Sequence, residues 1–151
     1  MSLIDFESLH KRSAEIGADF SARLPFHFTM FEGFFTANEA EKIYNSYPTI
    51  RDGMWDGTTY VDQKNKFQKT IFDSNSIFDG VFKELNSPEF LLWLEKITEI
   101  QDLVGDEQLF GGGLHQSIGG AFLNVHVDYN IHPKTKLHRR PSYSSFQSLF
   151  I

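Results

Sequence analysis

The sequence contains no cysteine, and this absence removes two kinds of site. Without thiols the chain can form neither a disulfide framework nor a thiolate metal centre. Any metal ion would therefore have to be bound by His, Asp or Glu. A chain without disulfides is also compatible with a reducing compartment.

Long apolar runs are missing as well. No segment approaches the roughly 20 consecutive apolar residues that a membrane-spanning helix needs. The first residues, Met-Ser-Leu-Ile-Asp-Phe-Glu, lack the basic stretch and apolar core of a secretory signal. We therefore expect a soluble cytoplasmic protein with no membrane partner.

The chain lacks an excess of positive charge, and its formal net charge is -6. Nucleic-acid binding requires a basic face, so we expect no nucleic-acid partner. The sequence also has no nucleophile elbow, no phosphate-binding glycine loop and no helical His-Glu-x-x-His. One local basic cluster is present, and it consists of Lys134, Lys136, His138, Arg139 and Arg140.

The 151 residues suit a single globular domain, with 40% hydrophobic and 23% charged residues. The 16 Phe residues provide material for a sizeable core. We expect the Phe-rich stretch 26–35 to belong to that core.

Four segments carry helix signals. The spacing of apolar residues predicts a helix over 4–18 and a short helix over 77–85. Thr36 and Glu39 form a capping box, which predicts a helix that ends near Pro48. Ser87-Pro88 predicts another helix start, because Ser is a good cap and Pro suits the first helical position.

Strand signals occur once early in the chain and become more frequent toward the C-terminus. Residues 26–30 alternate between apolar and polar side chains, which predicts a half-buried strand. Residues 50–75 are polar and indicate a long loop with one or two short strands, such as 58–61. After three consecutive glycines, alternating segments at 114–118 and 121–128 predict two further strands. Helices followed by late strands favour an α+β fold.

The segment Val125-His126-Val127-Asp128 contains the clearest candidate site. In a strand, residues two apart project from the same face, so His126 and Asp128 would point the same way. One imidazole and one carboxylate could then occupy neighbouring positions around a metal ion. Taken alone, the tripeptide is explained better by a solvated strand face with two polar residues.

The context of this tripeptide resembles the Fe(II)- and 2-oxoglutarate-dependent oxygenases, in particular the prolyl-hydroxylase-like branch. Within residues 111–140, a glycine pair, His126-x-Asp128, Asn130, His132-Pro133 and the doublet Arg139-Arg140 follow in the family's order. Upstream, Asn65-Lys66 and Ser87-Pro88 are also similar to the family pattern. The resemblance spans about residues 25–140.

The resemblance implies a double-stranded β-helix, or jelly roll, flanked by helices. It implies that His126 and Asp128 bind Fe(II), and that 2-oxoglutarate is the cosubstrate. The implied reaction is hydroxylation coupled to oxidative decarboxylation of 2-oxoglutarate. A protein side chain such as proline, or a small molecule, would be the substrate.

The resemblance stops after Arg140. The family continues with an apolar strand, a distal histidine as third iron ligand and a basic residue for 2-oxoglutarate, and residues 141–151 match none of these. We therefore expect a single incomplete domain (N-terminal helical segment 1–24, family-like region 25–140, aberrant tail 141–151), truncated after its first strands. A shift of reading frame would explain the tail. Such a chain would bind iron weakly, would not turn over and could oligomerise through exposed strand edges.

Two other interpretations remain open. The chain could be a non-catalytic remnant or interaction module, or a cupin-like metal protein that uses His126, Asp128 and His132 locally. Four residues near the motif could contact a ligand, although we expect a structural role for each: His115, Gln116, Asn124 and Tyr129. We expect His27 to be structural.

Overall fold

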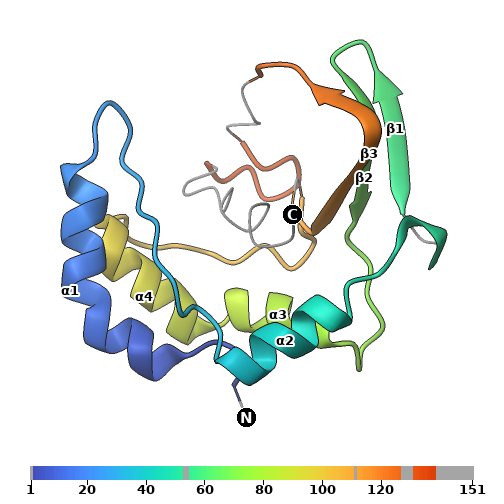
Figure 1. Ribbon diagram of the computed structural model, residues 1–151. Helices are drawn as coiled ribbons and strands as arrows, with labels where there is room; N and C mark the ends of the chain where they lie inside the picture. Colours follow the sequence, from blue (N-terminus) through green and yellow to red (C-terminus); the bar gives the residue numbers. More distant parts are fainter. Residues whose placement is uncertain (1, 53–54, 111, 127–130, 139–151) are drawn as a thin grey trace. The chain divides into compact units, whose positions relative to one another are not determined.

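The computed structural model describes residues 2–52, 55–110, 112–126 and 131–138 (Figure 1). Within these residues lie four α-helices and one three-stranded antiparallel sheet that is open, which confirms the predicted α+β class. No jelly roll is shown by these residues, so that part of the expectation stays a prediction. The chain divides into two compact units, which we call the helical unit (residues 1–47 and 73–107) and the sheet unit (48–72 and 108–151). The predicted domain limits at residues 24 and 140 also remain predictions.

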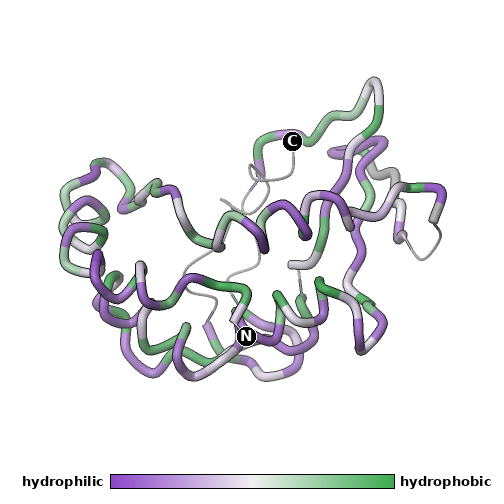
Figure 2. The backbone as a smooth tube through the Cα atoms, turned by 60° about the horizontal axis from the view of Figure 1, so that its bottom comes forward, coloured by the Kyte–Doolittle hydropathy of each residue, from purple (hydrophilic) through white to green (hydrophobic). Residues whose placement is uncertain are grey.

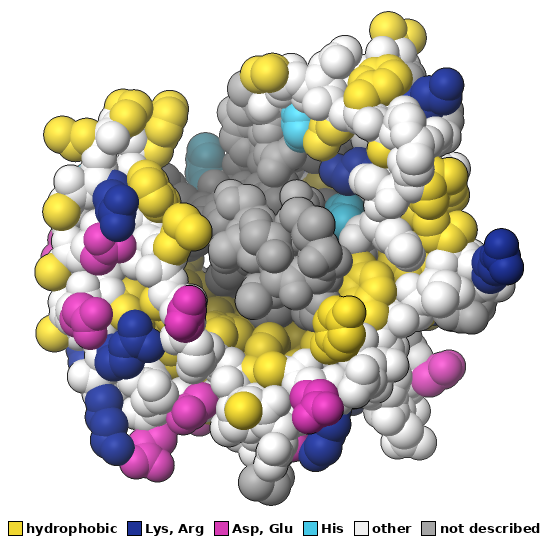
Figure 3. All heavy atoms as spheres, viewed as in Figure 1, with side chains coloured by type: hydrophobic (Ala, Val, Ile, Leu, Met, Phe, Trp, Pro, Cys, Tyr) yellow, Lys and Arg dark blue, Asp and Glu magenta, His cyan; other side chains and the backbone are white. Residues whose placement is uncertain are grey.

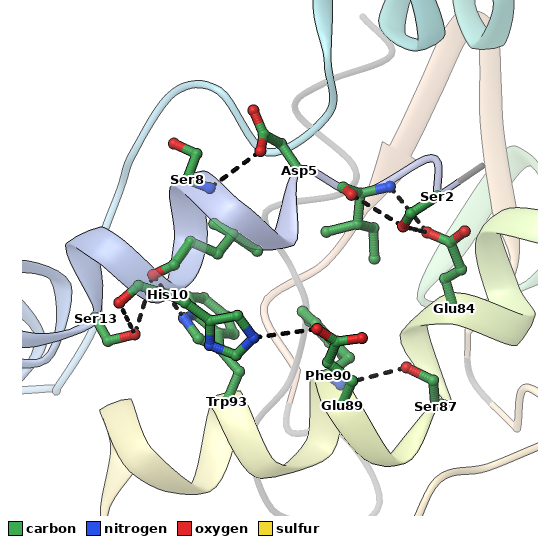
Figure 4. Close-up of polar contacts among 12 residues, drawn as sticks. Ser2, Asp5, Ser8, His10, Ser13, Glu84, Ser87, Glu89, Phe90 and Trp93 are labelled. Atoms are coloured by element: carbon green, nitrogen blue, oxygen red, sulfur yellow. Dashed lines mark hydrogen bonds and ion pairs between the residues drawn. The ribbon is translucent and has the colours of Figure 1, made fainter.

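Helix α1 spans Phe6–Ala22, which is longer than the predicted 4–18. It begins where the Asp5 carboxylate accepts a hydrogen bond from the Ser8 backbone N–H at 3.0 Å (Figure 4). Helices α3 (Ile77–Leu85) and α4 (Pro88–Thr98) confirm their predictions. The Ser87 hydroxyl accepts from the Phe90 N–H at 3.2 Å, as a cap residue before an N-terminal proline should.

Helix α2 spans Ala37–Asn45 and begins after Thr36, but the predicted capping box is not formed. The Thr36 side chain makes no cap hydrogen bond. Glu39 is buried instead, and its carboxylate accepts from Lys42 Nζ at 2.6 Å. The pattern therefore placed the start of the helix correctly although the bonding differs.

The core of the helical unit lies between α1 and α4, which pack against each other. Trp93 is 2% exposed, and its indole N–H donates to the Leu9 carbonyl at 3.2 Å. Phe31 and Phe90 contact the Trp93 ring with centroids at 5.8 and 5.5 Å. Hydrophobic and hydrophilic residues alternate along the helices (Figure 2), and the buried ones supply this aromatic core. None of the four helices described here combines the length and apolarity needed to cross a membrane.

Residues 26–30 do not form the predicted strand. This segment connects α1 to α2, and its polar groups bond back to α1, with the Thr29 hydroxyl donating to Asp19 at 2.9 Å. The Arg23 guanidinium lies 5.0 Å from the Phe28 ring centroid. Phe26 and Met30 are largely exposed, so the apolar alternation does not mark a buried face. The expectation of a core role holds only for the later phenylalanines, which pack with α4.

Glu84 on α3 fixes the start of the chain. Its carboxylate accepts hydrogen bonds from the Leu3 N–H at 2.9 Å and from the Ile4 N–H at 2.8 Å. The Ser2 hydroxyl donates to the same carboxylate at 2.9 Å (Figure 4). These bonds hold Ile4, which is 1% exposed, inside the helical unit.

The sheet unit contains β1 (Asp56–Tyr60), β2 (Gln63–Lys69) and β3 (Leu114–Leu123) in the order β1-β2-β3. A short 3-10 helix, η1 (Ile50–Asp52), precedes β1. Strand β1 confirms the prediction of a strand within the loop 50–75, beginning two residues before the expected 58–61. The second strand, β2, has the sequence Gln-Lys-Asn-Lys-Phe-Gln-Lys, and its lysines hid it from pattern analysis.

Strand β3 is one continuous strand where two were predicted. Gly119-Gly120 lies inside it, and the register with β2 shifts at this point. Gly120 has a φ of +75°, and Asn65 on β2 has a φ of +54°. The Asn65 side-chain amide donates to the Gly119 carbonyl at 3.0 Å, so the glycine pair is a bulge rather than a break. The strand ends at Leu123, and so the predicted strand 121–128 is wrong for residues 124–126.

Candidate metal centre

His126 lies three residues after the end of β3, in an exposed position. The chain between them is held to the sheet, because the Asn124 N–H donates to the Asp62 carbonyl at 2.9 Å. Asp62 belongs to the turn between β1 and β2. This bond extends the pairing of β2 and β3 by one residue pair. The turn therefore fixes the backbone two residues before His126.

The His126 ring is oriented by a second bond. Its Nδ1 lies 2.9 Å from the Asn124 carbonyl oxygen. A carbonyl can only accept, so Nδ1 must carry the proton. In the neutral ring the lone pair is then on Nε2, which is the form that binds metal ions when a second group holds Nδ1–H. The bond to Asn124 therefore orients the His126 ring in the way that second groups commonly orient metal-binding histidines.

Asp128, the other predicted ligand, lies outside the described residues, as do Tyr129, Asn130, Arg139 and Arg140. Whether His126 and Asp128 converge stays a prediction. Because β3 ends at Leu123, their expected placement within one strand is not shown.

His132 lies in a short turn closed by the bridge between Ile131 and His138. Its Nδ1 is 3.3 Å from the Lys134 N–H nitrogen and 3.1 Å from that of Thr135. Backbone N–H groups only donate, so Nδ1 accepts and the proton of the neutral ring sits on Nε2. This tautomer is opposite to that of His126 and leaves neither nitrogen with a lone pair available for a metal. The geometry disfavours His132 as a third ligand.

The two other candidates on β3 face opposite sides of the sheet, because His115 and Gln116 are consecutive strand residues. His115 pairs with Gln68 and Gln116 pairs with Phe67 on β2. Only one of the two can therefore face any given cavity. His27 lies in the helical unit, with its ring 5.6 Å from that of Phe20, which supports a structural role.

Within the residues that the structure describes, no group of three or more His, Asp or Glu side chains could hold a metal ion. What sequence reasoning missed is the contribution of Asp62 and the backbone of Asn124, which position His126. The available signal was the turn between β1 and β2, which contains Asp62. The polar composition of β2 obscured it, because β2 was not recognised as a strand.

The comparisons with known proteins give no family for this chain. No protein-family model matches it, and neither a curated protein nor a solved structure is significantly similar to it.

Proposed function

We propose that this chain is part of an Fe(II)- and 2-oxoglutarate-dependent oxygenase, in which His126 and Asp128 contribute two iron ligands. The supporting observation is the His126 ring, which is oriented by the hydrogen bond from its Nδ1–H to the Asn124 carbonyl, as metal-binding histidines commonly are. When bound, the iron with 2-oxoglutarate and oxygen would supply the oxidising chemistry. The substrate would be a protein side chain such as proline, or a small molecule.

The residues of the chain have a positioning role in this proposal. The bond from Asn124 to Asp62 fixes the backbone, and the bond from His126 to Asn124 fixes the ring. Both act before any metal arrives, so the imidazole would lose little freedom on binding. Asn124→Pro would remove the donor to Asp62 and should weaken metal binding without changing either ligand.

Two protein ligands hold ferrous iron less firmly than three, and residues 141–151 contain no histidine. We therefore expect weak Fe(II) binding and no succinate production from this chain alone. Detectable succinate from the purified chain would contradict that expectation.

An anaerobic titration tests the assignment. Fe(II) is added to the purified chain with and without 2-oxoglutarate, and binding is measured by calorimetry. The proposal predicts binding that tightens with 2-oxoglutarate and that falls by at least tenfold in both His126→Ala and Asp128→Ala. His138→Ala is the matched control, because it removes an exposed neighbouring histidine and should bind iron as the unaltered chain does.

The alternative functions give different outcomes in the same experiment. A non-catalytic interaction module, which the well-packed helical unit favours, would not bind iron. A cupin-like centre would bind iron independently of 2-oxoglutarate and would lose it in His132→Ala. The tautomer of His132 counts against the second alternative.

A further inference from the structure

The two units carry opposite net charge. The helical unit contains sixteen Asp and Glu residues against six Lys and Arg, a formal charge of -10. The sheet unit contains eight Lys and Arg against four Asp and Glu, a formal charge of +4, and the two values give the overall -6. Acidic side chains gather over the helical unit in Figure 3, and basic side chains stand on the sheet unit. Such an asymmetry within one chain indicates a partner of opposite charge.

The two units also differ in how their charges are paired. All six ion pairs between described residues lie within the helical unit. The amines of Lys64, Lys66 and Lys69 on β2 have no ion-pair or hydrogen-bond partner among the described residues. Lys134 and Lys136, from the basic cluster near the end of the chain, are exposed and equally unpaired there. These five amines are therefore available to an anion.

Residues outside the described ranges do not cancel this charge. The formal +4 already counts every residue of the sheet unit. Its charged side chains that the structure does not describe are two carboxylates, Asp52 and Asp128, and two guanidiniums, Arg139 and Arg140. These four contribute no net charge. The positive charge of the sheet unit thus comes from the described lysines.

Strand pairing places Lys66 on an accessible face of the sheet. Lys66 lies opposite Ser117 on β3, which is exposed, and it shares a face with Gln68 because the two are two residues apart. Lys69 lies on the other face, opposite Leu114, which is 4% exposed. The face that carries Lys66, Gln68 and Ser117 is called the Lys66 face below.

We infer that the Lys66 face binds an acidic peptide segment of a partner protein. Unpaired amines on a unit with a net charge of +4 attract an anion. In an extended peptide, alternate side chains project from one face about 7 Å apart, the same step that separates Lys66 from Gln68 along β2. The proposed oxygenase function is not needed for this inference, because neither His126 nor Asp128 takes part.

Two features favour a peptide over nucleic acid. The helical unit belongs to the same chain and carries a formal -10, so a long polyanion that extends beyond the sheet unit is repelled. A short acidic segment avoids this repulsion, because exposed charges are screened beyond about 8 Å at physiological salt. Successive bases also need aromatic side chains to stack on, and of the exposed apolar residues on β3 only Phe122 is aromatic.

A second copy of this chain is a weaker candidate. Its helical unit is acidic, but at least nine of the sixteen carboxylates there already accept hydrogen bonds or pair with cations inside that unit. These nine are Asp5, Glu7, Glu15, Asp19, Glu39, Asp79, Glu84, Glu89 and Glu95. A peptide segment presents all its carboxylates to the lysines.

Fluorescence anisotropy of a labelled decapeptide of alternating Glu and Ala tests the inference on the full chain without iron. The peptide should bind at low salt and should bind at least tenfold more weakly when salt rises from about 50 to 500 mM, since salt screens exposed charges. The same peptide with Gln in place of Glu should not bind. The salt dependence and the neutral peptide together identify charge as the cause of binding.

Two triple variants separate local charge from total charge. Replacing the three lysines of β2 with glutamine should weaken peptide binding at least tenfold. The matched control lowers the net charge equally, at exposed positions of the helical unit, and should bind as the unaltered chain does. It consists of Lys11→Gln, Lys83→Gln and Lys96→Gln. Circular dichroism establishes that both variants are folded.

Single substitutions locate the site on the sheet. Lys66→Gln should weaken binding more than Lys69→Gln, because the two lysines lie on opposite faces. Asp56→Asn should tighten binding, because Asp56 pairs with Gln68 and therefore lies on the Lys66 face, where its carboxylate repels an anion. Equal effects of Lys66→Gln and Lys69→Gln would refute the assignment to this face.

Other results would overturn the inference as a whole. They are the absence of peptide binding at low salt and an equal loss of binding in the two triple variants. Tighter binding of a thymidine oligonucleotide, or of phosphatidylserine vesicles, than of the peptide at equal charge would assign the face to a different partner. Salt-dependent dimerisation that the β2 triple variant abolishes would assign it to a second copy of the chain.

Discussion

The helical unit and the sheet unit differ in how far each one buries its own apolar residues. Of the twelve hydrophobic residues that are buried in the described part of the chain, all except Leu114 belong to the helical unit. Both units expose some apolar side chains, such as Phe26 and Met30 in the helical unit and Val61 and Val125 in the sheet unit, so the difference lies in what is buried. Helices satisfy their backbone bonds internally and need only a partner for one face. A three-stranded sheet also has two edges and two faces to cover.

This comparison suggests where each unit can be disrupted. In the helical unit, stability depends on side chains that pack and cap, such as Trp93 and Ser87. In the sheet unit, it depends on backbone geometry around β2 and β3. The following predictions are ordered from the largest expected effect to the smallest, and hydrogen exchange resolved by peptide reports the two units separately.

Trp93→Ala should have the largest effect, about 3–5 kcal/mol of unfolding free energy. The substitution removes the largest buried side chain and leaves the Leu9 carbonyl without its indole donor. Chemical denaturation measures the loss, and hydrogen exchange should increase first in α1 and α4. Leu92→Ala, one residue away and exposed, should cost much less. Equal costs for the two would contradict the assignment of the core.

Gly113→Ala should destabilise the sheet unit by about 1–3 kcal/mol. Gly113 has a φ of +95°, and a Cβ there would overlap the Lys69 carbonyl on the neighbouring strand. Gly119→Ala is the matched control, because a Cβ at Gly119 meets nothing within 4 Å. Hydrogen exchange of β2 and β3 should increase in Gly113→Ala alone. If α1 and α4 were affected equally, the two units would not be independent.

Ser87→Ala should cost about 1 kcal/mol, since the Ser87 hydroxyl accepts from the Phe90 N–H. Thr36→Ala makes a direct comparison, because Thr36 occupies the same cap position of α2 without a side-chain cap bond. Its cost should be smaller, as thermal unfolding of both variants would show. A larger cost for Thr36→Ala would mean that the capping box predicted from sequence does form.

The smallest expected effect on stability comes from the Asp19 carboxyl, and this effect depends on pH. Hydrogen bonds from Arg23, then from Thr29, hold the pKa of the Asp19 carboxyl below its ordinary value of 3.8. A depressed pKa favours the folded state above pH 3.8, and this contribution is lost as pH falls through the folded value. In Arg23→Gln, the NMR titration of Asp19 should move toward 3.8. Lys83→Gln, on α3, should leave it unchanged.

Sequence patterns were most informative in the helical unit. The starts of α3 and α4 and the position of α2 followed from cap residues and apolar spacing, because these signals act within a few residues of the chain. The strand at residues 26–30 was predicted incorrectly for the same reason. Alternation indicates that a segment could pair with a strand, but Thr29 bonds to Asp19, and none of the described strands pairs with residues 26–30.

The candidate site was only partly predictable. The types and spacing of His126 and Asp128 were evident in the sequence, whereas the tautomer of His126 depends on the Asn124 carbonyl. The same is true of His132, which the cupin-like alternative uses as a ligand but whose Nδ1 accepts hydrogen bonds from two backbone N–H groups. The orientation of each histidine ring thus depends on hydrogen bonds that its own sequence position does not specify.

The sequence by itself determined the α+β class, the cap residues of α3 and α4, and the uncharged composition of the segment that becomes β3. Each of these depends on residue type or short-range spacing. The tertiary structure alone decided that β2 is a strand, that Gly119-Gly120 is a bulge, and that β3 pairs with β2. These depend on hydrogen bonds between segments about 50 residues apart, and the energy of such a bond is set by which strand arrives opposite.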